Sequence, residues 1–237
     1  MISVSRKIWT QQKINKNLVE KVKQDYGFGD ILSQLIISRN YDTSEIYGVD
    51  NHQKLTNIFK DDKDYEKASL ILLNSINNNE NICILGDYDV DGACSTSLLI
   101  RYFSHINQKH FFYIPDRIAD GYGASKKLFQ KLLLKKPKLV IMVDCGSTSN
   151  EAIAYLNKHN IKSIIIDHHE INKPYPKSDA IINPKKEFIK KESSLLCATA
   201  LTYFFIDILI KKTKSNFNIT NFLIYVLLAT VCDVMPL

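Results

Sequence analysis

Three carboxylates stand at alternate positions directly after an apolar run. Residues 82–86 read Ile-Cys-Ile-Leu-Gly, and Asp87, Asp89 and Asp91 follow before Gly92. Side chains two residues apart lie on the same side of an extended backbone, so this spacing predicts three anions close together. Divalent cations prefer hard oxygen ligands and neutralise the repulsion between such anions. The segment therefore predicts a metal site.

The pattern D-x-D-x-D-G has one obvious alternative, the calcium-binding loop of an EF-hand. That loop ends in a bidentate glutamate six residues beyond its glycine. This chain has Leu98 at that position. The residues therefore favour a different kind of metal site.

Charged side chains also follow each of the next three predicted strands. These strand ends carry Asp116-Arg117, Asp144-Cys145-Gly146 and Asp167-His168-His169. Parallel strands present their carboxyl ends at one edge of a sheet, where ligands of such sheets bind. The sequence therefore predicts that acids, an arginine and histidines converge there.

The residue types at this edge suit a pair of divalent ions. Oxygen ligands favour Mg²⁺, whereas an imidazole shifts the preference toward Mn²⁺. Two such ions polarise a phosphoryl oxygen and activate a water molecule, and Arg117 is placed to hold a phosphate bidentately. Adjacent histidines on a strand point to opposite faces, which predicts that only one of His168 and His169 reaches a given ion. Cys145 is a poor candidate nucleophile because no base or helix N-terminus is evident beside it.

The elements that must position these residues alternate regularly along the chain. Short apolar runs predict strands at 82–86, 110–114, 139–143, 163–166 and 180–182. Intervening segments predict helices near 93–105, 125–135 and 149–159, and two apolar helices near 194–212 and 219–231. This order predicts an α/β fold with a doubly wound, mainly parallel sheet. Residues 1–75 are expected to form a helical arm, and residues 76–237 the catalytic domain.

Composition limits the class of protein. The 237 residues carry a net charge of +6, which is compatible with a polyanionic substrate. Five scattered cysteines without a C-x-x-C pair predict reduced thiols rather than disulfides or a zinc site. The sequence contains neither a signal-peptide core nor an apolar run that could span a membrane. A cytoplasmic protein is the expectation.

The motifs together resemble the DHH phosphoesterase superfamily, and within it the RecJ single-strand-specific exonucleases. The resemblance covers roughly residues 25–237. In order, the matching segments are Gly-Asp-Tyr-Asp-Val-Asp-Gly at 86–92, Arg-Ile-Ala-Asp-Gly-Tyr-Gly at 117–123, Val-Asp-Cys-Gly at 143–146, Asp-His-His at 167–169, Ile-Asn-Pro at 182–184 and Asp-Val-Met-Pro-Leu at 233–237.

The resemblance implies both a site and an activity. The implied metal ligands are Asp89, Asp91, Asp144, His168 and Asp233, with Asp144 bridging two Mn²⁺ or Mg²⁺ ions and Asp87 in or beside their shell. Asp144, His168 and His169 are the implied catalytic residues, and Arg117 and His169 are implied to bind substrate phosphate. The implied reaction is 5′ to 3′ release of 5′-mononucleotides from single-stranded DNA during repair and recombination, with a single-strand-binding protein or a helicase as partner. From the residues alone, Asp233 is only an acid at the end of an apolar helix.

Two departures from the family pattern keep other functions open. Ala198, Ala200 and Ala229 stand where RecJ-like proteins usually have glycine. A second (DHHA1-type) domain and an oligonucleotide-binding domain, into which RecJ proteins continue, are expected to be absent. The alternatives are a DHH phosphodiesterase for short oligonucleotides or small phosphoesters, and a truncated, non-catalytic remnant.

Overall fold

The computed structural model describes residues 8, 10, 13–41, 46, 55–121, 123–186 and 193–236. Tyr122 and Leu237, which belong to two of the motifs above, lie outside the described residues, as does part of the predicted arm. The chain divides into two compact units, residues 1–56 and 57–237.

The smaller unit contains two described helices, α1 (Lys16–Tyr26) and α2 (Asp30–Ser38). Asn15 caps α1 through its side chain, and Gly27 ends the helix in the left-handed conformation. Val22, Ile36 and Ile46 form a small core. The described part of the predicted arm therefore contains the helices α1 and α2.

The boundary between the units lies earlier in the chain than the predicted arm boundary at residue 75. Helix α4 (Lys63–Asn77) belongs to the larger unit, because its Tyr65 and Leu72 are buried in the same core as Phe205. Asp62 caps this helix by accepting hydrogen bonds from two backbone amides of its first turn. Helix α4 therefore covers one face of the sheet.

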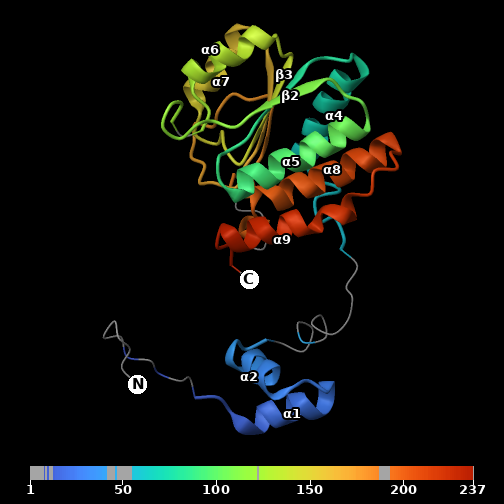
Figure 1. Cartoon of the computed structure of the whole chain (residues 1–237), viewed down its shortest axis with the longest axis vertical. Coiled ribbons are helices and arrows are strands. Elements are labelled where there is room, and N and C mark those ends of the chain that lie inside the picture. The colour runs from blue at the N-terminus through green and yellow to red at the C-terminus, as the bar shows by residue number, and fades with distance from the viewer. Residues whose placement is uncertain are drawn as a thin grey trace. The chain divides into compact units, whose positions relative to one another are not determined.

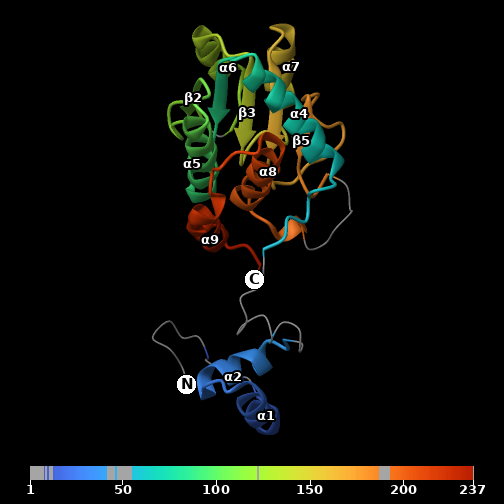
Figure 2. The same ribbon diagram turned by 90° about the vertical axis from the view of Figure 1, so that its right-hand side faces the viewer.

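The larger unit is built around one parallel sheet with the strand order β2-β1-β3-β4-β5 (Figures 1 and 2). Its strands are β1 (Ile82–Leu85), β2 (His110–Tyr113), β3 (Leu139–Val143), β4 (Lys162–Ile166) and β5 (Ala180–Ile182). Its remaining helices are α5 (Val90–His105), α6 (Lys126–Leu132), α7 (Asn150–Lys158), α8 (Ala198–Thr213) and α9 (Leu223–Cys232). Short 3₁₀ turns occur at Leu133–Lys135, Ser193–Leu195 and Ile219–Phe222. The doubly wound α/β fold is confirmed.

Alternating side chains bury both faces of the sheet. Ile82 and Ile84 pack with α4, α5 and α8, whereas Cys83 and Leu85 pack with α6 and α7. Both faces are covered, which explains why the strands read as continuous apolar runs rather than as alternating patterns. All five cysteines have free thiols, as their scattered positions predicted.

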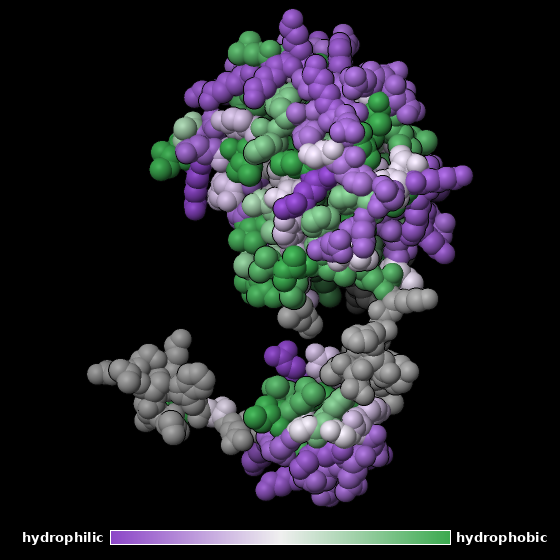
Figure 3. Space-filling view, turned by 45° about the vertical axis from the view of Figure 1, so that its right-hand side comes forward, coloured by the Kyte–Doolittle hydropathy of each residue, from purple (hydrophilic) through white to green (hydrophobic). Residues whose placement is uncertain are grey.

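Helix α9 is apolar around most of its surface. It packs against α5 and α8, yet Leu223, Ile224, Leu227 and Val231 remain between 40% and 57% exposed. Figure 3 shows apolar side chains gathered at the end of the larger unit where α9 lies. Within the described residues, no helix combines the length and apolarity needed to cross a bilayer.

Candidate metal centre

The candidate site lies where the strand order reverses. After β1 the chain moves to β2 on one side, and it then returns to form β3 on the other side of β1. The segments that follow β1 and β3 therefore diverge from neighbouring strands, which opens a crevice at their carboxyl ends. Asp87 follows β1, and Asp144 follows β3. The residues after β1 and β3 therefore meet at this edge, as predicted.

The three aspartates after β1 do not form one extended row. The helix α5 begins at Val90, so Asp89 is its N-cap and Asp91 lies in its first turn. Asp89 Oδ1 accepts a hydrogen bond of 2.8 Å from Gly92 N. Asp87 and Asp89 face Asp144, whereas Asp91 faces His168 and Asp233. The three side chains would share one side only if this segment were extended, and it is not extended because α5 begins at Val90.

Gly92 allows this loop to fold tightly onto the first turn of α5. A methyl group at position 92 would lie 2.5 Å from the carbonyl oxygen of Asp87 and 2.6 Å from its Cα. Backbone atoms cannot move aside as a flexible side chain can, so a substitution would displace the loop that carries Asp87 and Asp89. The glycine in the motif therefore serves close packing.

We expect Gly92→Ala to destabilise the protein by about 3 kcal/mol and to weaken Mn²⁺ binding at least about tenfold. Chemical denaturation and metal titration would measure the two effects. Gly29→Ala is the matched control, because a methyl group there meets nothing within 4 Å. Equal losses in both variants would contradict this account of the loop.

Asp144 is the most unfavourably placed carboxylate in the site. It is fully buried, and neither of its oxygens has a hydrogen-bond partner among the described residues. Its backbone adopts the left-handed conformation with φ of 59°, which costs free energy in a non-glycine residue. Burial, followed by the charges of Asp91 and Asp89, raises the pKa of Asp144 to about 11. A bound cation would reverse each of these electrostatic costs.

His168 stands at the centre of three carboxylates. Its Nε2 lies 3.3 Å from Asp144 Oδ1, 3.4 Å from Asp233 Oδ2 and 3.6 Å from Asp91 Oδ2. Both ring nitrogens are buried, and neither has a hydrogen-bond partner in the described part of the chain. One ring nitrogen and three carboxylate oxygens that point at the same space are what a divalent ion of the Mn²⁺ type requires.

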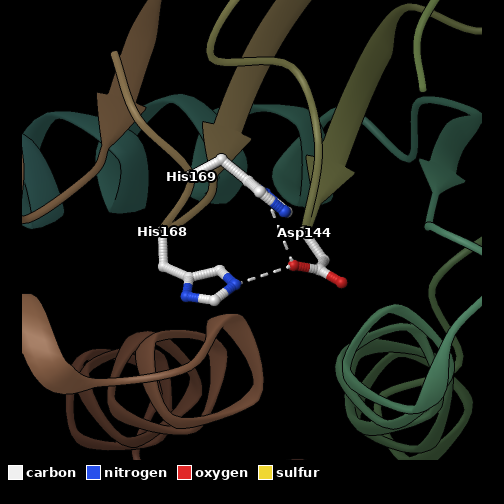
Figure 4. Close-up of side chains that lie close together, drawn as sticks. All are labelled: Asp144, His168 and His169. Carbon is white, nitrogen blue, oxygen red and sulfur yellow. Dashed lines mark ion pairs between the residues drawn. The ribbon is translucent and has the colours of Figure 1, made fainter. Parts of the chain in front are cut away.

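The second histidine also reaches the site. His169 Nδ1 lies 3.8 Å from Asp144 Oδ1, and Figure 4 shows both imidazoles directed toward that carboxylate. Which of the two reaches a given ion stays a prediction, but the reason given for it does not apply here. Strand β4 ends at Ile166, so both histidines lie in the following loop, where strand alternation no longer applies.

Asp167 supports this loop rather than facing the cluster. Its Oδ1 accepts hydrogen bonds from His169 Nδ1 at 2.8 Å and from the backbone amides of His168 and His169. Its Oδ2 accepts one from Ser147 N. Despite burial, these bonds and the nearby imidazole lower the pKa of Asp167 to about 2. The same contact raises the pKa of His169, which favours its protonated form.

Asp91 joins the site to the start of α8. Its carboxylate accepts hydrogen bonds from the backbone amides of Ala198 and Thr199, both at 2.7 Å, and from Thr199 Oγ1 at 2.6 Å. The side chain therefore caps α8, whose own N-cap residue, Cys197, makes no such bond. Sequence reasoning missed Thr199, since its link to Asp91 spans more than 100 residues and leaves no local pattern.

Asp233 completes the cluster from the far end of the chain. It ends α9 and places Oδ2 beside His168, with 28% of its side chain exposed. Burial raises its pKa. Asp233 therefore lies at the end of a helix, as inferred from its neighbours in the sequence. It also lies beside His168, one of the ligands that the resemblance implies.

Arg117 and its neighbour Asp116 lie outside the cluster. The guanidinium carbon of Arg117 lies 5.4 Å from the centre of the Tyr88 ring, and Tyr88 stands between Asp87 and Asp89. Asp116 instead accepts hydrogen bonds from the amides of Ile118 and Ala119 within its own turn. Of the two residues predicted at the end of β2, only Arg117 is oriented near the metal loop.

Two further features bear on earlier predictions. The thiol of Cys145 is buried, and burial raises its pKa well above the ordinary value, which fits the rejection of a nucleophilic role. Ala198, Ala200 and Ala229 are buried, and Ala200 and Ala229 pack together with Cys197. The methyl groups at the family's glycine positions are thus accommodated between helices.

The chemistry of the donor set fits divalent ions. Three groups of side chains each bring their ligand atoms within 4.8 Å of one another, namely Asp87, Asp89 and Asp144; Asp91, His168 and Asp233; and Asp144, His168 and His169. Asp144 belongs to two of the groups, as does His168. This sharing is the arrangement expected for two neighbouring ions.

The chain is similar to known proteins. Residues 81–230 match the model of the DHH family, N-terminal domain. The chain is 28% identical over 184 residues to the single-stranded-DNA-specific exonuclease RecJ of Bacillus subtilis, covering 77% of this chain and 23% of that protein. It is 30% identical over 183 residues to RecJ of Escherichia coli, covering 73% and 32%. The chain thus spans about a quarter to a third of the length of these relatives.

A solved structure shares the fold. The crystal structure of RecJ in complex with Mn²⁺ from Thermus thermophilus superposes with a TM-score of 0.72 at 19% identity, covering 94% of this chain and 31% of that one. At this identity the likeness concerns the fold alone.

Proposed function

Because this chain belongs to the DHH family, we propose that it is a metal-dependent phosphodiesterase that removes nucleotides from single-stranded DNA, as RecJ does. We further propose 5′ to 3′ polarity, release of 5′-mononucleotides and a role in DNA repair and recombination. The relatives' names support the substrate class.

One observation carries the metal-dependent part of the proposal. Asp144 and His168 are buried, touch each other and have no hydrogen-bond partners for their side-chain polar atoms among the described residues. Buried polar atoms without partners are costly, and they are rarely kept without a function. A divalent cation is the partner that these donors suit.

Each residue then has a role. Asp89, Asp91, Asp144, His168 and Asp233 would hold two Mn²⁺ or Mg²⁺ ions, with Asp87 at the edge of their shell. When bound, such ions polarise a phosphoryl oxygen and acidify a coordinated water. Asp167 orients the ring of His169 through Nδ1, and His169 would bind a phosphate oxygen of the substrate.

A cleavage assay tests the proposal. The purified chain would be incubated with Mn²⁺ and 5′-labelled single-stranded DNA, duplex DNA or a dinucleotide, with EDTA controls. Mn²⁺-dependent mononucleotide release from the single strand alone would support a RecJ-like activity. Cleavage of the dinucleotide alone would instead assign the chain to the phosphodiesterases of short oligonucleotides. Metal binding without any cleavage would contradict both enzymatic assignments.

Arg117 is the proposed contact to substrate phosphate, and it offers a sensitive variant. We expect Arg117→Lys to raise KM about tenfold with little change in kcat, because a lysine keeps the charge but loses the planar fork that pairs bidentately with phosphate. Steady-state kinetics on a labelled oligonucleotide would measure this. Equal KM values for the variant and the wild type would show that Arg117 does not bind the substrate phosphate.

A further inference from the structure

A groove runs from the metal loop along the outer surface of α5. Its first part, with a volume of about 440 Å³, is lined by Tyr88 and Asp89 at one end and by Ser97 and Tyr225 at the other. A second hollow of about 600 Å³ continues from Ser97 to His105. Ser97 lines both hollows, so they adjoin on this face of α5, and the first reaches Asp89, a proposed metal ligand. The two hollows together are called the groove below.

The floor of the groove is a single face of α5. Val90, Cys94, Ser97, Arg101 and His105 line it at intervals of three or four residues, which is the spacing of one helical face. At a rise of 1.5 Å per residue, the face from Val90 to His105 is about 23 Å long. That length matches roughly seven stacked nucleotides at about 3.4 Å each, or fewer in an extended strand.

Aromatic rings from the end of the chain line the opposite side. Phe217 and Phe222 stack with ring centres 5.4 Å apart and an interplanar angle of 14°. Tyr225 follows, 5.9 Å from Phe222. All three rings are partly exposed. Helices α5 and α9 are in contact, and the three rings line the two hollows together with residues of α5.

Arg101 adds positive charge to this surface. Its guanidinium carbon lies 5.2 Å from the centre of Phe222 and 5.7 Å from that of Tyr225, and its Nε donates a hydrogen bond of 3.0 Å to the Tyr225 hydroxyl. The side chain is exposed, and the described residues that line the second hollow include no carboxylate. Aromatic rings that alternate with cations are the surface that single-stranded nucleic acid prefers.

We propose that this groove binds the single-stranded part of the substrate, with bases against Phe222 and Tyr225 and a phosphate at Arg101. The proposal rests on the proposed function, since it assigns the groove to a strand whose end lies at the metal centre. A duplex would hide its bases from the rings, so the groove selects single strands by stacking.

Binding of fluorescent (dT)₁₂ by the whole chain tests the groove separately from catalysis. Fluorescence anisotropy in EDTA measures binding where no metal-dependent cleavage occurs. We expect Arg101→Glu to weaken binding about tenfold, and Arg101→Gln to lower the slope of log K against log salt by about one, as the loss of one phosphate contact requires. The control is Lys158→Glu, which makes the same charge change on an exposed residue of α7, the helix that covers the other face of the sheet.

A second groove variant distinguishes loss of binding from loss of folding. Ser104→Glu places an anion on an exposed position of the same lining, and it should also weaken (dT)₁₂ binding while keeping the thermal midpoint of the wild type. If both Glu variants bound (dT)₁₂ with the same affinity as Lys158→Glu, the proposal that the groove binds the strand would be overturned. Duplex DNA bound as tightly as (dT)₁₂ by the wild type would also overturn it. Absence of Mn²⁺-dependent cleavage by the wild type would count against the proposed function instead.

Discussion

Replacing Asp144 by asparagine is expected to abolish cleavage and at the same time to stabilise the metal-free protein. The carboxylate is shared by two of the ligand groups, so its loss weakens both ions. If the ions supply about 4 kcal/mol of transition-state stabilisation, activity should fall about a thousandfold. Single-turnover cleavage of labelled single-stranded DNA in Mn²⁺ would measure this loss.

The stability effect of Asp144→Asn has a defined pH dependence. In the unfolded chain an aspartate titrates near pH 3.9, whereas burial and the neighbouring aspartates raise the pKa of Asp144 to about 11 in the fold. Between these values the folded state binds a proton that the unfolded state releases, so the contribution of Asp144 to stability falls as the pH rises above about 4. An asparagine needs no proton. We expect the variant to gain up to about 4 kcal/mol at pH 7 and almost nothing near pH 4.

Denaturation of both proteins in EDTA at the two pH values measures this difference. The comparison between variant and wild type cancels the titration of all other groups that the substitution leaves in place. A variant that is less stable than the wild type at pH 7 would show that Asp144 is satisfied without metal, against this account.

The same substitution at Asp91 should have the opposite effect on stability. The carboxylate of Asp91 accepts three short hydrogen bonds at the start of α8. In Asp91→Asn one oxygen becomes an NH₂ group that faces backbone donors, and the negative charge at the helix N-terminus disappears. We expect a loss of about 3 kcal/mol in EDTA, together with loss of metal-dependent cleavage.

Asp91→Asn and Asp144→Asn make the same chemical change, and each is the control for the other. Denaturation in EDTA should separate them by sign, while the cleavage assay should find both inactive. If both variants lost stability, it would be wrong that the Asp144 carboxylate destabilises the metal-free fold while the Asp91 carboxylate stabilises it. If Asp91→Asn kept normal stability, the hydrogen bonds to α8 would contribute little to the fold.

The fold was largely predictable because the strands and helices leave local patterns in the sequence. These patterns are the spacing of apolar residues and the change to polar residues where a strand ends. Runs such as residues 139–143 are short, apolar and rich in β-branched side chains, and the observed strand has the predicted bounds. The start of α5 was predicted three residues late, because the acids at 89 and 91 read as a loop although Asp89 is in fact an N-cap. Because α5 begins at Val90, Asp91 lies in the helix and belongs to a different group of ligands from Asp87 and Asp89.

The site was predictable only in part because its support is non-local. Convergence at the sheet edge brought Asp87, Asp144 and His168 together from residue type and topology alone. Thr199 was invisible, since its role depends on where α8 begins relative to α5. The orientation of both histidines toward Asp144 depends on how the loop after Ile166 turns around Asp167, which strand periodicity does not determine.

The most direct test of the central claim is the location of Mn²⁺ in crystals of this chain. Anomalous scattering should reveal two ions at the carboxyl edge of the sheet, one beside Asp91, His168 and Asp233 and one beside Asp87 and Asp89, with Asp144 between them. Crystals of Asp144→Asn should lose one or both peaks. Mn²⁺-soaked crystals of the active protein with no anomalous peak within bonding distance of Asp144 or His168 would contradict the claim that this buried cluster is a metal centre.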